Sequence, residues 1–340
     1  MTQARHRAYA TDLLRQMRSG ERSSEDIVRE HLDLIELEQP KLNAVTKVFR
    51  EKALAEAHNP APGPLSGLPI TLKETFGIEN CEVTIGSLRM RPIQCTEHSE
   101  PVKKLRAAGA IVIARSNVPE FVMTGETDNL LYGRTNHPAD STRTCGGSTG
   151  GEGTLVGSGC SRLGFGTDIL GSIRIPSCLC GIVGFRPHSG AVDKAGVWPV
   201  SGEFFETWNG IGPLARSVRD VRQAYGVIAR QSLPAPADVT ALRLIVPNGF
   251  RLKYKTPCIK NAYLDAQEKL KTAGLNVENH NFSDVPKLYL NIPRLVTGEM
   301  IEPWTEWLSS NGERFKPASE MIRQVLGRPT VYPGFFMWFV

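Results

Sequence analysis

The sequence predicts an α/β protein, because amphipathic helical segments alternate along the chain with short apolar runs. Residues 23–39 carry apolar side chains at helical spacing, and residues 68–72 form a short apolar run of the kind found in buried strands. A second helical pattern at 101–108 is followed by another apolar run at 110–114. The 340 residues, 41% hydrophobic and 22% charged, suit a soluble globular protein, and we predict one domain over 1–340.

The N-terminal part, residues 1–58, is predicted to be mainly helical. Its expected elements are helices over 11–20, 23–39 and 51–57 and a strand over 42–49. Ser23 and Asp26 have the spacing of a capping box at the start of the second helix. Because proline interrupts helices, this helix is predicted to stop at Pro40.

A core predicted over 65–231 follows a Pro/Gly-rich connector. Its first strand ends at the pair Lys73 and Glu74, and functional groups of α/β proteins gather where strands end. A turn-rich segment covers 129–138. The later predicted elements are a helix over 217–229, a loop over 232–240, a strand over 242–246 and a helix over 257–273.

Composition excludes several classes of function. The net charge is +5 without a block of Lys and Arg, so nothing favours nucleic-acid binding. No apolar run reaches the roughly 18 residues of a membrane-spanning helix, and the N-terminus lacks the pattern of a signal peptide. The seven cysteines and seven histidines have no metal-ligand spacing, so we predict no metal, reduced thiols and a cytoplasmic location.

The run from Thr144 to Pro187 differs in amino-acid composition from the rest of the chain. It is dense in glycine and hydroxyl residues, which suits a backbone that turns sharply and approaches a ligand closely. Ser148 lies in the stretch GGSTGG, and Ser172 lies in DILGSIR. Either serine alone is weak evidence, and their significance comes from the length of the pattern around them.

This run resembles the signature of the amidase-signature family of serine hydrolases. The family pattern reads GGSSGG, then GTD-x-GGSIR-x-P, then CG-x-x-G-x-(K/R)P, and the match extends over more than forty consecutive residues. Glu152 and Gly153 after the double glycine resemble the fatty-acid amide hydrolase branch. The resemblance implies a large, mixed, twisted sheet covered by helices on both faces, and no cofactor.

The resemblance also implies a Ser-Ser-Lys catalytic triad. Ser172 falls at the nucleophile, Ser148 at the bridging serine and Lys73 at the base. A serine hydroxyl becomes nucleophilic when a base removes its proton, and a lysine can do so only when burial lowers its pKa enough to make it neutral. In the family the bond before the bridging serine is cis, so we expect a cis Gly147–Ser148 bond.

The expected oxyanion hole consists of the backbone amides of Ile169, Leu170, Gly171 and Ser172. Leu170 departs from the family, in which glycine is common. If this position requires a positive φ, leucine would be strained, and its side chain could also narrow the cavity.

Three further residues are expected to support the site. Thr149 replaces the second serine of the family pattern and keeps a hydroxyl that could hold Lys73, while Asp168 and Arg174 are expected to brace the loop around the nucleophile.

An apolar channel for an acyl chain is expected near the site. Its candidate wall residues are Phe121, Val122, Met123, Leu130, Leu131, Tyr132, Phe204 and Phe205. The chain is shorter than is usual for the family, and it stops within an apolar cluster, 335–340, that would normally be buried against another surface.

The sequence therefore predicts an enzyme that hydrolyses small-molecule amides, such as fatty-acyl amides, through an acyl-enzyme intermediate. One alternative is a glutaminase subunit of a tRNA-dependent amidotransferase, which would need partner subunits; the other is a shortened, catalytically impaired paralogue. Peripheral membrane contact and a homodimer stay open.

Two unrelated motifs fit less well. Gly146 to Gly150 matches a G-x-S-x-G nucleophile elbow but lacks a strand before it, and no Gly-Lys-Ser/Thr completes a phosphate-binding loop.

Overall fold

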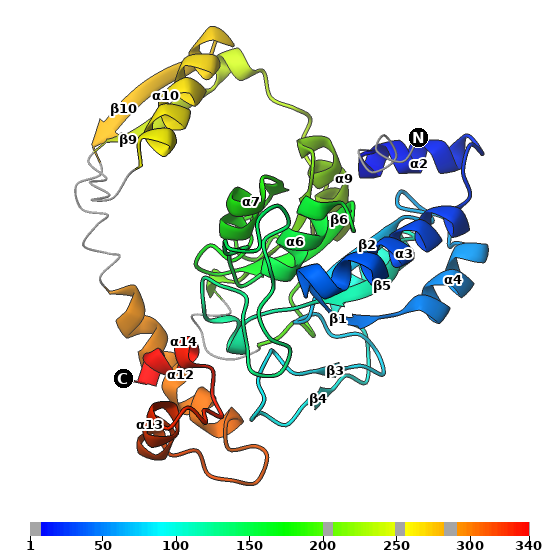
Figure 1. Ribbon diagram of the computed structural model, residues 1–340. Coiled ribbons are helices and arrows are strands. Elements are labelled where there is room, and N and C mark those ends of the chain that lie inside the picture. Colours follow the sequence, from blue (N-terminus) through cyan, green and yellow to red (C-terminus); the bar gives the residue numbers. More distant parts are fainter. Residues whose placement is uncertain (1–7, 200–206, 249–255, 282–290, 340) are drawn as a thin grey trace. The chain divides into compact units, whose positions relative to one another are not determined.

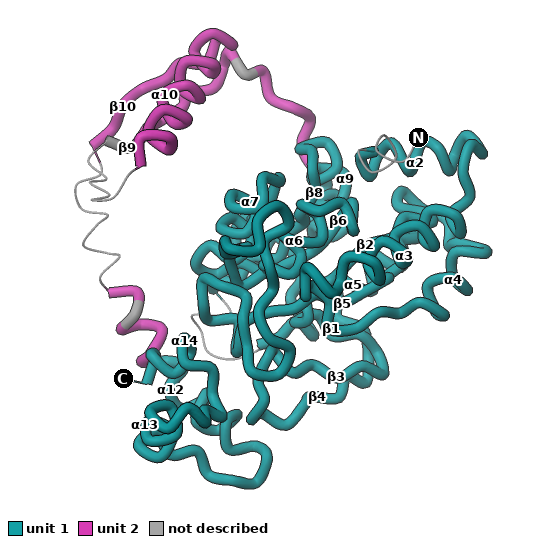
Figure 2. The backbone as a smooth tube through the Cα atoms, viewed as in Figure 1, with its two compact units in different colours: residues 1–232, 299–340 teal, residues 233–298 magenta. Residues whose placement is uncertain are grey.

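The computed structural model describes residues 8–199, 207–248, 256–281 and 291–339. The chain divides into two compact units, Met1–Ser232 with Glu299–Val340, and Leu233–Gly298 (Figure 2). The single domain over 1–340 stays a prediction.

Unit 1 is built on a mixed six-stranded sheet with the order β1-β5-β2-β6-β8-β7 (Figure 1). The strands are β1 (Val45–Val48), β2 (Pro69–Lys73), β5 (Ile111–Ser116), β6 (Leu163–Asp168), β7 (Val183–Gly184) and β8 (Gly210–Ala215). β2 pairs in parallel with β5 and β6, and the outer pairings are antiparallel. The predicted mixed sheet is confirmed. Because β2 and β6 are parallel, Lys73 and Asp168 end their strands at the same edge.

Helices pack on both faces of this sheet. Successive side chains of a strand point to opposite faces, and β5 shows the result. Val112 belongs to an apolar cluster that includes residues of α2, α5 and α9, whereas Ile111 and Ile113 belong to a second cluster with residues of α3, α4 and α6. The helices are α2 (Ala10–Arg18), α3 (Ser24–Leu42), α4 (Arg50–His58), α5 (Glu100–Ala107), α6 (Gly150–Ser158) and α9 (Val218–Ile228).

The predicted end of α3 at Pro40 was wrong. The helix continues to Leu42, which is 1% exposed, and Asn43 terminates it with a left-handed φ of 46°. Proline lacks an amide hydrogen, but in the last turn it removes only one helical hydrogen bond. Burial of Leu42 among the residues of the second cluster outweighs that loss, so β1 starts later than predicted.

Several short elements complete unit 1. They are β3 (Glu82–Val83), β4 (Ile93–Gln94), α7 (Arg174–Cys180), α13 (Pro317–Val325), α14 (Pro333–Phe336) and the 3₁₀ turns Glu120–Val122 and Met337–Phe339. Strand β8 was not predicted, because its sequence GIGPLA contains glycine and proline and lacks alternation.

Unit 2 contains a parallel strand pair, β9 (Arg243–Asn248) and β10 (Asn276–Asn281), joined through α10 (Pro257–Thr272). A 3₁₀ turn, Val239–Ala241, precedes β9, and the boundary between the units falls inside α12 (Ile292–Trp307). Strand β9 and helix α10 confirm two predicted elements.

Candidate active site

Lys73 lies at the end of β2 with no exposed surface. Its Nζ lies 2.8 Å from Ser148 Oγ, 2.8 Å from Thr167 Oγ1 and 3.4 Å from the Thr167 carbonyl oxygen. The parallel pairing of β2 with β6 brings Thr167 to this position. The sequence analysis missed Thr167, although its place directly before Asp168 at a strand end was a usable signal.

Burial lowers the pKa of Lys73 to about 7, against the opposing attraction of Asp168 and Glu152. A neutral amine has two hydrogens and one lone pair. Its three contacts can therefore be two donations to Thr167 and one hydrogen bond accepted from Ser148. The surroundings of Lys73 thus suit a neutral base near physiological pH.

Ser148 lies in a tight turn whose predicted cis Gly147–Ser148 bond is confirmed. A Cβ atom at Gly147 would lie 2.6 Å from the carbonyl oxygen of Thr124, so only glycine fits there. Thr127 holds both sides of the turn: its hydroxyl donates to the Gly146 carbonyl at 2.9 Å and accepts from the Gly150 amide at 3.1 Å. Thr127 was not singled out from the sequence.

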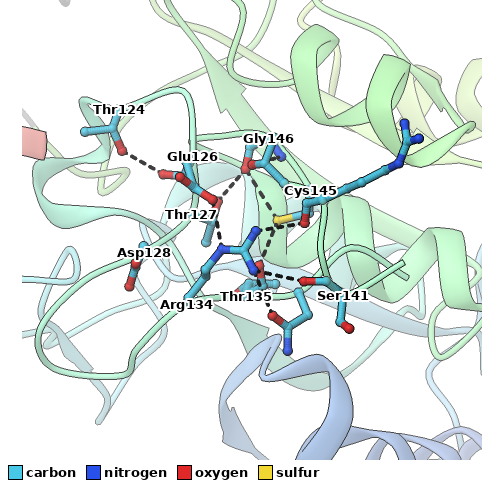
Figure 3. Close-up of polar contacts among 12 residues, drawn as sticks. Thr124, Glu126, Thr127, Asp128, Arg134, Thr135, Ser141, Cys145 and Gly146 are labelled. Atoms are coloured by element: carbon cyan, nitrogen blue, oxygen red, sulfur yellow. Dashed lines mark hydrogen bonds and ion pairs between the residues drawn. The ribbon is translucent and has the colours of Figure 1, made fainter. Parts of the chain in front are cut away.

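A polar network supports the segment that contains Thr127 (Figure 3). Arg134 donates through Nε to Glu126 at 2.9 Å, and its other nitrogens donate to the carbonyl oxygens of Ser141 and Arg143 at 3.1 and 2.8 Å. Arg134 therefore ties the segment before the signature run to the turn that leads into it.

Asp168 organises the loop that carries Ser172. Its carboxylate accepts hydrogen bonds from the amides of Gly171 and Ile173 at 2.7 and 3.1 Å and from Arg174 Nε and Nη2 at 3.0 and 2.9 Å. Burial raises the pKa of Asp168, but its hydrogen bonds and ion pair with Arg174 outweigh this effect and hold the pKa below its usual value. This geometry matches the bracing role expected for Asp168 and Arg174.

The amides expected in the oxyanion hole divide into two groups. The Gly171 amide was expected in the oxyanion hole, but it donates to the Asp168 carboxylate instead. A buried carboxylate needs donors, and this amide is one of them. Among the described residues, no acceptor receives a hydrogen bond from the amides of Ile169, Leu170 or Ser172. These three amides remain candidates for an oxyanion hole.

Leu170 does not have the strained backbone considered above. The described non-glycine residues with positive φ are Asn43, Asn80, Ile85, Phe121 and Val122, whereas Gly171, with φ 124°, takes the unusual conformation in this loop. The Leu170 side chain lines the cavity, so its effect is on the space available to a substrate.

A cavity of about 190 Å³ contains both serines. It is lined by Val122, Met123, Thr124, Gly125, Gly147, Ser148, Thr167, Ile169, Leu170, Ser172, Ile175 and Trp338. No hydrogen bond joins the Ser148 and Ser172 hydroxyls in the part of the chain that the structure describes. The two serines therefore line one cavity, and Lys73 lies behind it in contact with Ser148.

The predicted channel wall is only partly found at this cavity. Of its candidate residues, Val122 and Met123 line the cavity, and Phe204 and Phe205 lie outside the described residues. The four other candidates, Phe121, Leu130, Leu131 and Tyr132, are not among the residues that line it.

The aromatic residues near the end of the chain supply a further wall. Trp338 lines the cavity and donates through Nε1 to the Met123 carbonyl oxygen at 3.1 Å. Phe335 is fully buried, and its ring centroid lies 4.8 Å from that of Phe121. The expectation that this apolar cluster is buried is confirmed for Phe335 and Phe336.

Thr149 contacts Lys73 only indirectly. Its hydroxyl donates to the Thr167 carbonyl oxygen at 3.2 Å, and that oxygen in turn accepts from Lys73. The sequence predicted a direct hydrogen bond between Thr149 and Lys73. The structure instead connects these two side chains through the Thr167 carbonyl oxygen, which accepts from both.

The alternative motifs gain no support from the structure. Residues 141–144 form a turn and an isolated bridge instead of the strand that a nucleophile elbow needs, and no histidine lines the cavity. The described residues contain no cluster of three or more His, Cys, Asp or Glu that could hold a metal ion. Among their helices, none combines the length and apolar character needed to cross a bilayer.

Comparisons with known proteins agree with this geometry. Fatty-acid amide hydrolase 2-B of Danio rerio is 30% identical over 94% of this chain. A glutamyl-tRNA(Gln) amidotransferase subunit from Synechococcus sp. (strain CC9605) is 34% identical over 68% of it. The chain spans 66% of the first relative and 48% of the second.

Solved structures show the same fold. One described as "Crystal structure of amidase" matches 94% of this chain and 74% of its own with a TM-score of 0.82 and 27% identity. One described as "Fatty acid amide hydrolase" matches 93% of this chain and 60% of its own with a TM-score of 0.80 and 25% identity. A family model described as Amidase matches residues 26–329. The chain belongs to the amidase family.

Proposed function

We propose that this chain hydrolyses carboxylic amides through an acyl-enzyme formed on Ser172. The observation that carries the proposal is the buried, hydrogen-bonded pair of Lys73 and Ser148 at a cavity that Ser172 also lines. Membership of the amidase family supports the same chemistry.

In the proposed reaction, Lys73 accepts the proton of Ser148 while Ser148 accepts the proton of Ser172. Ser172 Oγ then forms a bond to the amide carbon, and the negative charge that develops on the oxygen is stabilised by amides of the 169–172 loop. The proton returns from Lys73 through Ser148 to the nitrogen as the carbon–nitrogen bond breaks. Water releases the acid by repeating these transfers.

We further propose that the acyl group is apolar, such as a fatty-acyl chain. Val122, Met123, Leu170, Ile175 and Trp338 give the cavity an apolar lining, and the described lining residues include no charged side chain. The likeness to the Danio rerio fatty-acid amide hydrolase supports this substrate class.

The first test is covalent labelling by a fluorophosphonate probe, measured by intact mass. We expect Ser172→Ala to abolish labelling, and Ser148→Ala and Lys73→Ala to slow it by about 10²–10⁴-fold, the usual contribution of proton transfer. The control is Ser158→Ala, a hydroxyl that bonds only within its own helix end among the described residues. A folded wild-type protein that is not labelled would contradict the proposal and favour the impaired paralogue.

The second test compares amide substrates. Hydrolysis of long-chain acyl amides in preference to acetamide would support the apolar acyl group. The amidotransferase alternative rests on the Synechococcus relative, and glutamine cleavage that requires added partner subunits would favour it.

A further inference from the structure

Glu152 takes no part in the proposed proton transfers, yet it is completely buried in the first turn of α6. The space for its side chain comes from Gly164 on β6, since a Cβ atom there would lie 2.0 Å from Glu152 Oε2. A carboxyl group with no access to water needs either donors to stabilise its charge or a proton to remove it.

The hydrogen bonds around Glu152 form a linear chain of four oxygen atoms. Thr71 Oγ1 lies 2.5 Å from Glu152 Oε2 and 3.0 Å from Ser161 Oγ, which lies 3.0 Å from the Leu163 carbonyl oxygen. Thr71 has one hydroxyl proton and is placed to donate either to Glu152 or to Ser161. The carbonyl can only accept, so Ser161 donates to it, and we assign the Thr71 proton to Ser161. With this assignment, the remaining contact between Glu152 and Thr71 needs a proton on the carboxyl group.

The second oxygen of Glu152 gives an independent argument. Oε1 is buried and has no hydrogen-bond partner. A carboxylate shares its charge over both oxygens, so an ionised Glu152 would leave a charged oxygen without water and without a hydrogen bond, although the Ser116 hydroxyl acts on the same carboxyl group. The carbonyl oxygen of a neutral acid tolerates such a position at a lower cost.

We propose that Glu152 is a neutral carboxylic acid that donates its proton to Thr71, and that this neutrality keeps Lys73 uncharged and able to accept the proton of Ser148. Glu152 is thus a positioning residue that acts through the base. The role in Lys73 chemistry rests on the proposed hydrolase, whereas the protonated state of Glu152 does not.

The electrostatics of the two groups agree with this assignment. Burial raises the pKa of Glu152 to about 8, against opposing effects of the Thr71 and Ser116 hydroxyls and of Lys73. Lys73 is acted on by Asp168 and Glu152, and its own burial lowers its pKa to about 7. Transfer of one proton from Lys73 to Glu152 converts a buried ion pair into a neutral pair without changing the net charge, and burial favours the neutral pair.

Infrared difference spectroscopy of the whole chain tests the protonated state directly. We expect the wild type at pH 6–7 to show the carbonyl stretch of a buried carboxylic acid that Glu152→Gln removes. Glu120→Gln is the matched control, because Glu120 is also buried and burial raises its pKa to about 7. Loss of only a carboxylate band in Glu152→Gln would overturn the proposal.

The pH dependence of probe labelling tests the effect on Lys73. Glutamine is neutral and can donate to Thr71, so we expect Glu152→Gln to leave the acidic limb of the profile at the same pH. A shift of the acidic limb to lower pH by about 1–3 units would show that the substitution had removed a carboxylate charge next to Lys73. That result would overturn the proposal.

Ser161→Ala should act in the opposite direction. Without an acceptor at Ser161, the Thr71 hydroxyl can turn and donate to Glu152, which favours the carboxylate and raises the pKa of Lys73. We expect the acidic limb to move to higher pH, and an unmoved limb would contradict the hydroxyl chain. Absence of labelling in the wild type would overturn the hydrolase proposal alone, since the infrared result does not depend on labelling.

Discussion

Asp168 and Glu152 are both fully buried and both act on Lys73, but the two regions around them differ in the donors that they offer. Asp168 receives three backbone amides and two nitrogens of Arg174. Glu152 contacts the Thr71 hydroxyl and is acted on by the Ser116 hydroxyl, but one of its oxygens makes no hydrogen bond. Among the described residues, no cation pairs with it as Arg174 pairs with Asp168. The comparison teaches that burial alone does not set the charge of a carboxyl group; the supply of donors does.

Asp168→Asn should have the largest effect. The asparagine side chain turns an NH₂ group toward amide and guanidinium donors, which leaves several of them unpaired. We expect a loss of about 2–5 kcal/mol in the free energy of unfolding in urea, together with loss of labelling at Ser172. Asp265→Asn, at an exposed helical ion pair, is the control and should change stability by less than about 0.5 kcal/mol. Equal losses in both variants would refute the argument.

Lys73→Met should raise stability while it abolishes labelling. Lys73 has a pKa of about 7 when folded against an ordinary 10.5, so the unfolded chain binds more protons between these values and stability rises with pH there. The cost of burying lysine is therefore greatest below pH 7 and declines toward pH 10.5. We therefore expect the gain in melting temperature of Lys73→Met to be largest below pH 7 and to decline toward pH 10.5. A gain that does not depend on pH would contradict the lowered pKa of Lys73.

Gly164→Ala should destabilise the protein by about 1–3 kcal/mol, because its new methyl group would overlap Glu152, which has no room to move. The control is Gly298→Ala in α12, where a Cβ atom meets nothing within 4 Å and alanine favours the helix. Thermal unfolding of the two variants checks this, and an unchanged melting temperature for Gly164→Ala would show that Glu152 can rearrange.

Glu152→Gln should have the smallest effect on stability, less than about 1 kcal/mol, because it replaces one neutral donor with another. It is the direct counterpart of Asp168→Asn, and urea unfolding of both variants gives the comparison. If Glu152→Gln lost as much stability as Asp168→Asn, both carboxyl groups would be charged and the difference between the two regions would disappear.

The sequence was sufficient for local features with strong signals. The capping serine of α3, the α/β alternation and the long motif run around Ser148 and Ser172 each depend on neighbouring residues, and the structure agrees with them. The end of α3 was misjudged because a local rule about Pro40 could not include the burial of Leu42.

The sequence by itself determined the family through its long motif run, and the resemblance to that family implied the mixed sheet and the two serines that line the cavity. Only the tertiary structure decided which groups are partners. Thr167 takes the place at Lys73 expected for Thr149, Asp168 takes the amide of Gly171, and Thr71 and Ser161 determine where the proton of Glu152 can go. Hydrogen bonds act over about 3 Å, and the distances between groups on different strands are fixed only when the sheet is assembled.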